Sequence, residues 1–250
     1  MSRPLDELHQ ALNAVGVSDA ALSDRDTAHL LVDAHRALST HEVPGVRVEV
    51  RGGLFAVHAR VRVEAGARIA NPVHLCFGMF HRVGAQRVRL EVEVGDHASV
   101  RFLAHCLFAR ARRASHVMHA RVHLGRGARL EIEEGHVHGP SGGVRVKPRA
   151  HIVLEPEARF FSDFSLLQGR VREHKTEYSV DVGAGALAEL GVRVLGRGDD
   201  RIRLRDRIRL NGEGARGMVK SRVALQDRAR AIVYGTTEGQ TETIARHIAE

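Results

Sequence analysis

Apolar and polar residues alternate through most of the chain, from about residue 46 to residue 234. In the segments 46–50, 57–63, 88–94 and 120–124, every second residue is apolar. A period of two places successive side chains on opposite faces of a strand. Glycine-rich stretches separate many of these segments, so the pattern predicts many short strands joined by turns.

A seven-residue pattern is superimposed on this alternation. It consists of an apolar residue, three variable positions, an alanine, any residue and usually a second apolar residue. The five clear copies centre on Ala67, Ala98, Ala128, Ala158 and Ala186, and looser copies centre on Ala215 and Ala229. The spacing of about thirty residues indicates a repeat architecture, in which each unit buries its apolar face by stacking on its neighbours.

Three β architectures can contain many short strands. Propeller blades usually need about forty residues each, which is more than this period. A sandwich has no reason to repeat its turn motif, whereas a solenoid rebuilds the same corner in every turn, where a small alanine fits between stacked rungs. The sequence therefore predicts a mainly β fold, a β-solenoid (parallel β-helix).

Both ends of the chain have a different pattern. Apolar residues at helical spacing predict two helices, over about 3–16 and 26–38, followed by a break at 42–45. The last residues, from about 238, read as the start of another helix. The predicted organisation is an N-terminal helical segment at 1–44, a β-helix core at 45–235 and a short C-terminal helix at 236–250.

Charge and composition narrow the function. The net charge of +8 comes mainly from arginines that alternate singly with apolar residues, and the chain has no Trp and only 4% aromatic residues. This distribution favours a solvated outer strand face over a nucleic-acid site. The sequence contains neither an apolar run long enough to span a membrane nor a secretory signal, so we expect a cytoplasmic protein.

Histidine and cysteine are the candidate chemical groups. Seven of the 17 histidines lie between residues 97 and 138, around Cys106. The alternation from Val100 to Phe108 places Cys106 on the apolar face, where it is either a buried structural thiol or a ligand. His136 and His138 share a strand face and are candidate metal ligands. The acids Glu131, Glu133 and Glu134 lie just upstream, and Glu131 and Glu133 share a face if the strand is unbroken.

Nucleotide and flavin sites are not supported. The chain has no P-loop motif and no nucleophile elbow. Residues 231–245 resemble the strand, phosphate loop and helix that open a flavodoxin-like domain, with Thr236, Thr237, Gly239 and Thr241 at the phosphate positions. Only nine residues follow Thr241, so we expect no FMN site and no self-contained nucleotide site.

Residues 57 to 235 resemble the SufB/SufD family of iron–sulfur cluster assembly proteins. The order and spacing of several segments carry the resemblance. These segments are 61–73, 100–106, 133–139, 144–150 and 216–229.

The resemblance implies a right-handed parallel β-helix that follows a helical N-terminal segment. It also implies a scaffold rather than an enzyme, working with the ATPase SufC, a second SufB/SufD-type subunit and a sulfur donor. In this family a cysteine inside the β-helix accepts sulfur for a transient iron–sulfur cluster, and Cys106 falls at the matching place.

The chain departs from the family near Gly239, where members continue with further cluster ligands and with helices that dock SufC. We therefore expect this chain to be a truncated or diverged member that lacks those segments. Two other functions stay open. One is a metal-dependent solenoid enzyme that uses His136, His138 and Glu133, and the other is a structural solenoid that binds a protein partner.

Overall fold

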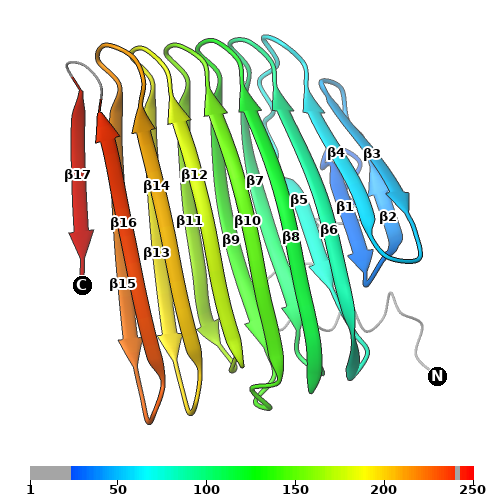
Figure 1. Ribbon diagram of the computed structural model, residues 1–250. Coiled ribbons are helices and arrows are strands. Elements are labelled where there is room, and N and C mark those ends of the chain that lie inside the picture. The colour runs from blue at the N-terminus through cyan, green and yellow to red at the C-terminus, as the bar shows by residue number, and fades with distance from the viewer. Residues whose placement is uncertain (1–23, 240–242) are drawn as a thin grey trace.

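The computed structural model describes residues 24–239 and 243–250, and within these residues it contains strands but no helix. Two sheets lie one over the other, and successive turns stack in chain order from the blue end to the red end of Figure 1. From β4 onward, consecutive strands alternate between the two sheets. The described part of the chain is thus a parallel β-solenoid of about seven turns, as the sequence predicts. Its handedness stays a prediction.

We call the nine-stranded sheet the A sheet and the eight-stranded sheet the B sheet. The A sheet contains β1 (His29–Asp33), β2 (Arg36–His41), β5 (Val73–Gly78), β7 (Ser99–Phe108), β9 (Arg129–His138), β11 (Arg159–Gln168), β13 (Leu187–Gly196), β15 (Arg216–Leu225) and β17 (Ile244–Ala249). The B sheet contains β3 (Val46–Gly52), β4 (Val57–Val63), β6 (Val83–Val94), β8 (Arg113–Leu124), β10 (Val144–Leu154), β12 (Glu173–Val182), β14 (Arg201–Leu210) and β16 (Arg230–Gly239).

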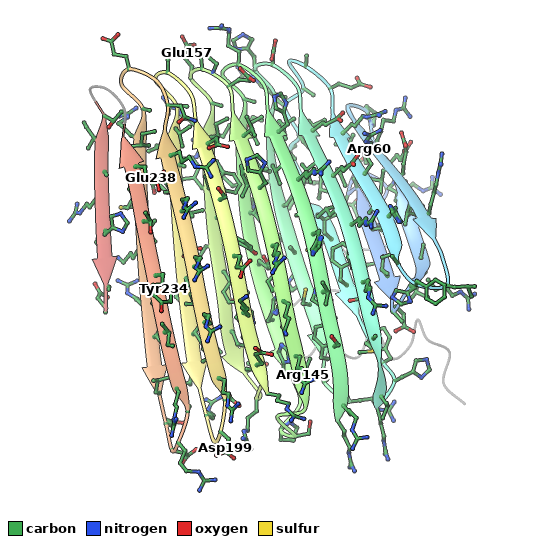
Figure 2. All side chains as sticks on the ribbon, viewed as in Figure 1. Arg60, Arg145, Glu157, Asp199, Tyr234 and Glu238 are labelled. Carbon is green, nitrogen blue, oxygen red and sulfur yellow. The ribbon has the colours of Figure 1, made fainter. Side chains whose placement is uncertain are left out.

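The repeated alanine forms the corner that joins a B-sheet strand to the next A-sheet strand. Its N–H donates to the carbonyl three residues earlier, as Ala158 does to Glu155 at 3.2 Å. The residue before it takes a left-handed backbone, with φ of 66° at Glu157 and 62° at Gly127. Glycine adopts this conformation at little cost, which explains its frequency at that position. Figure 2 shows Glu157 at such a corner.

The corners stack directly on one another. The Ala128 carbonyl accepts from the N–H of Arg159, and the Ala158 carbonyl accepts from the N–H of Leu187, at 2.8 and 2.9 Å. Both alanines are fully buried. A small side chain is therefore required where one corner sits on the next.

The helix predicted over residues 26–38 is a pair of strands instead. The segment predicted as a helix at 26–38 contains β1 and part of β2, which form an antiparallel hairpin, and β1 also pairs in parallel with β5. The apolar pattern there is short enough to fit a helical period as well as the strand period of two. Pairing with β5 favours the strand. The helix predicted over 3–16 lies outside the described residues.

The C-terminal segment is also extended. β16 runs to Gly239 and includes Thr236 and Thr237, and β17 pairs in parallel with β15. The flavodoxin-like loop and helix are thus not formed in the described residues there. Paired strands continue on both sides of the boundaries predicted near residues 44 and 235, because each added strand satisfies the backbone groups of its neighbour. None of the described residues belongs to a helix that could cross a membrane.

Arginines on the outer faces form ion pairs between neighbouring rungs. Arg60 contacts Glu91 at 2.7 Å, and Arg62 contacts Glu93 at 3.0 Å. Arg60 is labelled on the outer face in Figure 2. Such exposed pairs contribute little stability each, but they explain why arginine alternates with apolar residues along the strands.

We predict that Ala158→Leu will lower the free energy of unfolding by about 1–3 kcal/mol, because the larger side chain overpacks a buried corner. Urea denaturation followed by circular dichroism measures this loss. Ala109→Leu, at an exposed turn position, is the control and should change stability little. An equal effect of the two substitutions would contradict the role assigned to the corner.

Candidate functional site

Cys106 lies on the inward face of β7, where the alternation predicts it. Its neighbours in the A sheet are Phe77 on β5 and His136 on β9. The Cys106 side chain is 2% exposed and packs in the main apolar core. Parallel pairing in register thus aligns the cysteine with a histidine one turn further along the solenoid.

Glu134 and His136 face inward from β9 beside this thiol. The carboxylate Oε1 of Glu134 lies 2.7 Å from Nε2 of His136. One potential ligand atom from each of Cys106, Glu134 and His136 lies within 4.8 Å of the other two. Sulfur, carboxylate and imidazole donors thereby meet at one point inside the solenoid.

The structure changes the ligand set that the sequence suggested. Glu133, assigned to the possible enzyme site, is exposed on the outer face, and the inward acid is Glu134, because neighbouring residues of a strand point to opposite sides. His138 is buried and its ring stacks on that of His136 with centroids 5.9 Å apart. It is not one of the three residues whose ligand atoms converge.

The opposite sheet contributes His116 and Gln86, which sequence reasoning did not single out. Nε2 of His116 lies 3.9 Å from Sγ of Cys106, and Nδ1 of His116 lies 2.7 Å from Oε1 of Gln86. Gln86 and His116 are register partners on β6 and β8. Gln86 and His116 are thirty residues apart, which is one repeat, and both occupy inward positions of the alternation. This spacing was the sequence signal that could have identified them.

Two further side chains of the B sheet complete the polar interior. The Tyr178 hydroxyl donates to Oε2 of Glu134 at 3.2 Å. Nε2 of His174 lies 2.8 Å from the Thr176 hydroxyl oxygen. The His174 ring meets the His136 ring edge-on at a centroid distance of 5.7 Å. We define the inner polar cluster as Cys106, His116, Glu134, His136, His138, His174 and Tyr178.

The remaining histidines of the 97–138 segment are not in this cluster. His97 lies in an exposed corner, and His119 and His123 project from the outer face. His105 is on the outward side of β7, and burial lowers its pKa to about 4. Clustering in sequence therefore overstated the number of histidines around Cys106.

Burial keeps the cluster largely uncharged. Desolvation raises the pKa of the Cys106 thiol well above its ordinary value of 9.0, so the group is a thiol at neutral pH. Desolvation also lowers the pKa of His116 to about 3, and it lowers the pKa values of His138 and His174 well below 6.5. The imidazoles of His116, His138 and His174 are therefore neutral and have lone pairs available as proton acceptors or ligands.

The other cysteine has a different environment. Cys76 is buried on the outward side of the A sheet with Leu31 and Leu107. Burial raises the pKa of its thiol to about 12. A thiol of this kind is a small apolar core residue, and it makes a matched control for Cys106.

Asp206 extends the buried polar row beyond Tyr178, its register partner on β12. The Asp206 side chain is 1% exposed, and its Oδ2 has no hydrogen-bond partner among the described residues. Desolvation raises the pKa of this carboxyl from 3.8 to about 7. Between these pH values the folded protein holds a proton that the unfolded chain has released, so stability falls as pH rises through this interval.

We predict that Asp206→Asn will change the free energy of unfolding more favourably at pH 8 than at pH 4, by about 2–4 kcal/mol, because the amide cannot ionise. Chemical denaturation of both proteins at the two pH values measures the difference. Glu213→Gln, at an exposed position, should show no such pH dependence. The same stability difference for Asp206→Asn at both pH values would show that the carboxyl is not held protonated.

Comparisons with known proteins agree with this architecture. A scan against models of protein families finds no match. An iron–sulfur cluster assembly SufBD family protein of Pyrococcus horikoshii is 29% identical over 233 residues, which cover 92% of this chain and 70% of the relative. A protein of the same description from Methanocaldococcus jannaschii is 24% identical over 219 residues, 88% of this chain and 69% of the relative. Over about nine tenths of its length, the chain is therefore similar to iron–sulfur cluster assembly proteins of the SufBD family.

Proposed function

We propose that the protein is a non-enzymatic scaffold for iron–sulfur cluster assembly and that Cys106 is its sulfur acceptor or cluster contact. The observation that carries this proposal is the burial of the thiol beside the side chains of Glu134, His136 and His116 inside the solenoid. Both relatives are described as iron–sulfur cluster assembly proteins. Iron and sulfide are the substrates of such a scaffold, not resident cofactors.

The local chemistry suits sulfur transfer. In transfer from a persulfide R–S–SH, the Cys106 sulfur attacks the outer sulfur, the S–S bond of the donor breaks and R–SH leaves, so Cys106 becomes Cys–S–SH. Only a thiolate attacks efficiently, and Cys106 is a thiol at rest. Nε2 of His116 lies 3.9 Å from Sγ and is placed to accept a hydrogen bond from the thiol, which orients the sulfur.

We propose three partners for this scaffold: a SufC-type ABC ATPase, a second SufB/SufD-type subunit and a sulfur donor. The resemblance to the family supports all three. The last strands add a surface argument for the second subunit, since the large apolar side chains of Ile232, Tyr234 and Ile244 are exposed there. Tyr234 is labelled on β16 in Figure 2.

We predict that anaerobic incubation with iron and sulfide will produce a visible sulfur-to-iron charge-transfer absorption that Cys106→Ala abolishes, because the variant lacks the thiolate ligand. Absorption and circular dichroism spectra of desalted protein measure this. Cys76→Ala is the matched control and should retain the spectrum. An unchanged spectrum in Cys106→Ala would remove the role proposed for this residue.

We predict that an ABC-type ATPase of the SufC class will co-elute in size-exclusion chromatography with this solenoid once a family member's segment beyond the position of Gly239 is fused to it, because the resemblance places the docking helices in that segment. Multi-angle light scattering of the same peak gives the number of subunits. Separate elution of the ATPase at concentrations of tens of micromolar would argue against this partnership, and a complex with one solenoid chain would argue against the second subunit.

A further inference from the structure

We propose that the inner polar cluster binds one divalent cation of the Fe²⁺ class through Cys106, Glu134 and His136 in the absence of sulfide. His116 lies outside this convergent group of three but has its Nε2 3.9 Å from Sγ of Cys106, and it becomes the fourth ligand when its ring moves toward the ion. This inference rests on the proposed assembly function and specifies the order of its substrates, with iron able to enter first. It assigns ligand roles to Glu134 and His116, which the resemblance does not provide.

The first support is the convergence of three ligand atoms. One donor atom each from Cys106, Glu134 and His136 lies within 4.8 Å of the others. Metal–ligand bonds of about 2.0–2.3 Å in a tetrahedral site place the ligand atoms about 3.3–3.8 Å apart. The three side chains therefore need to move by only about an ångström, and the hydrogen bond between Glu134 and His136 opens as they bind.

The second support is the orientation of His116. The Gln86 amide nitrogen donates to the carbonyls of Ala34 and Gly78, at 2.9 and 3.0 Å. Oε1 of Gln86 must then face His116 and accept from its Nδ1–H, at 2.7 Å. The lone pair of the neutral ring is left on Nε2, the atom beside Sγ of Cys106. Histidines that bind metals are commonly fixed in one tautomer by such an outer partner.

The third support is a set of buried ring nitrogens without partners among the described residues. These are Nδ1 of His136, both nitrogens of His138 and Nδ1 of His174. All three side chains are at most 4% exposed, and leaving such buried polar groups without hydrogen bonds destabilises the fold. A cation with its bound water supplies the hydrogen bonds and charge that these groups lack. Tyr178 already orients the carboxylate of Glu134 from outside.

The donor set selects the metal. Thiolate and imidazole donors favour Fe²⁺, Co²⁺ and Zn²⁺ over Mg²⁺ and Ca²⁺, which prefer oxygen ligands. Binding displaces the proton of the Cys106 thiol, because a metal ligand must be the thiolate. Fe²⁺ is the member of this group that the proposed function uses.

The test is an anaerobic titration of the full chain with Co²⁺, which reports on its ligands through its absorption. We expect one ion per chain, with a near-ultraviolet thiolate-to-cobalt band, and displacement by Fe²⁺. Cys106→Ser should lose the thiolate band. Glu134→Gln and His116→Phe should weaken binding at least tenfold, and Gln86→Leu should weaken it about 10–100-fold through the histidine that it orients.

Matched controls are available on the same strands. Glu133→Gln and His119→Phe change exposed neighbours, and Cys76→Ser changes the other buried thiol, so all three should bind Co²⁺ like the wild type. Far-ultraviolet circular dichroism confirms that each variant is folded. If a variant does not fold, the isosteric Glu134→Gln substitution decides.

Each outcome supports or overturns the proposal. Absence of stoichiometric Co²⁺ binding, or binding that is insensitive to Cys106→Ser and Glu134→Gln, overturns the cation site. Reconstitution with iron and sulfide tests the assembly function independently of the Co²⁺ titration. A cluster that forms in a protein unable to bind Co²⁺ removes the cation site and leaves the assembly function. Co²⁺ binding without cluster formation supports the cation site and argues against the assembly function.

Discussion

The structure depends on the direct stacking of one corner on the next. The corner alanines from Ala98 to Ala215 are buried, and the backbone carbonyl of each accepts a hydrogen bond from the next rung. A larger side chain would separate the rungs, and an irregular spacing would break the pairing of the strands that follow. Because the corner recurs at a nearly constant interval, every strand begins in register with the strand below it.

This register determines the chemistry of the interior. Residues that occupy the same inward position in successive turns form rows, so a polar residue in one turn lies beside its counterpart in the next. Cys106 and His136 meet in this way in one sheet, and Gln86 and His116 meet in the other. The two rows then face each other across the interior and bring Cys106 next to His116.

The inner polar cluster carries a cost that packing alone does not explain. An apolar interior of the same shape would avoid the desolvation of several imidazoles, a carboxylate and a phenol, which is large where partners are missing. The interior on both sides is apolar, in two separate clusters that include Phe102 and Leu204. The inner polar cluster therefore brings together side chains of β7, β8, β9 and β12, as expected of a site that binds a ligand.

The corner motif and the alternation of apolar residues determined the solenoid, its strands and the inward position of Cys106, because both are local patterns that any turn of this fold must satisfy. Shorter segments were read wrongly. The residues of β1 and β2 fit a helical period as well as a strand, and only pairing with β5 decided between them. Alternation already places Glu134, not Glu133, on the strand face of His136. The tertiary structure alone decided that these side chains converge with Cys106 and that His116 approaches Cys106 from the opposite sheet. Contacts between residues in different turns depend on register and on the separation of the two sheets, and neither quantity is encoded in any single stretch of sequence.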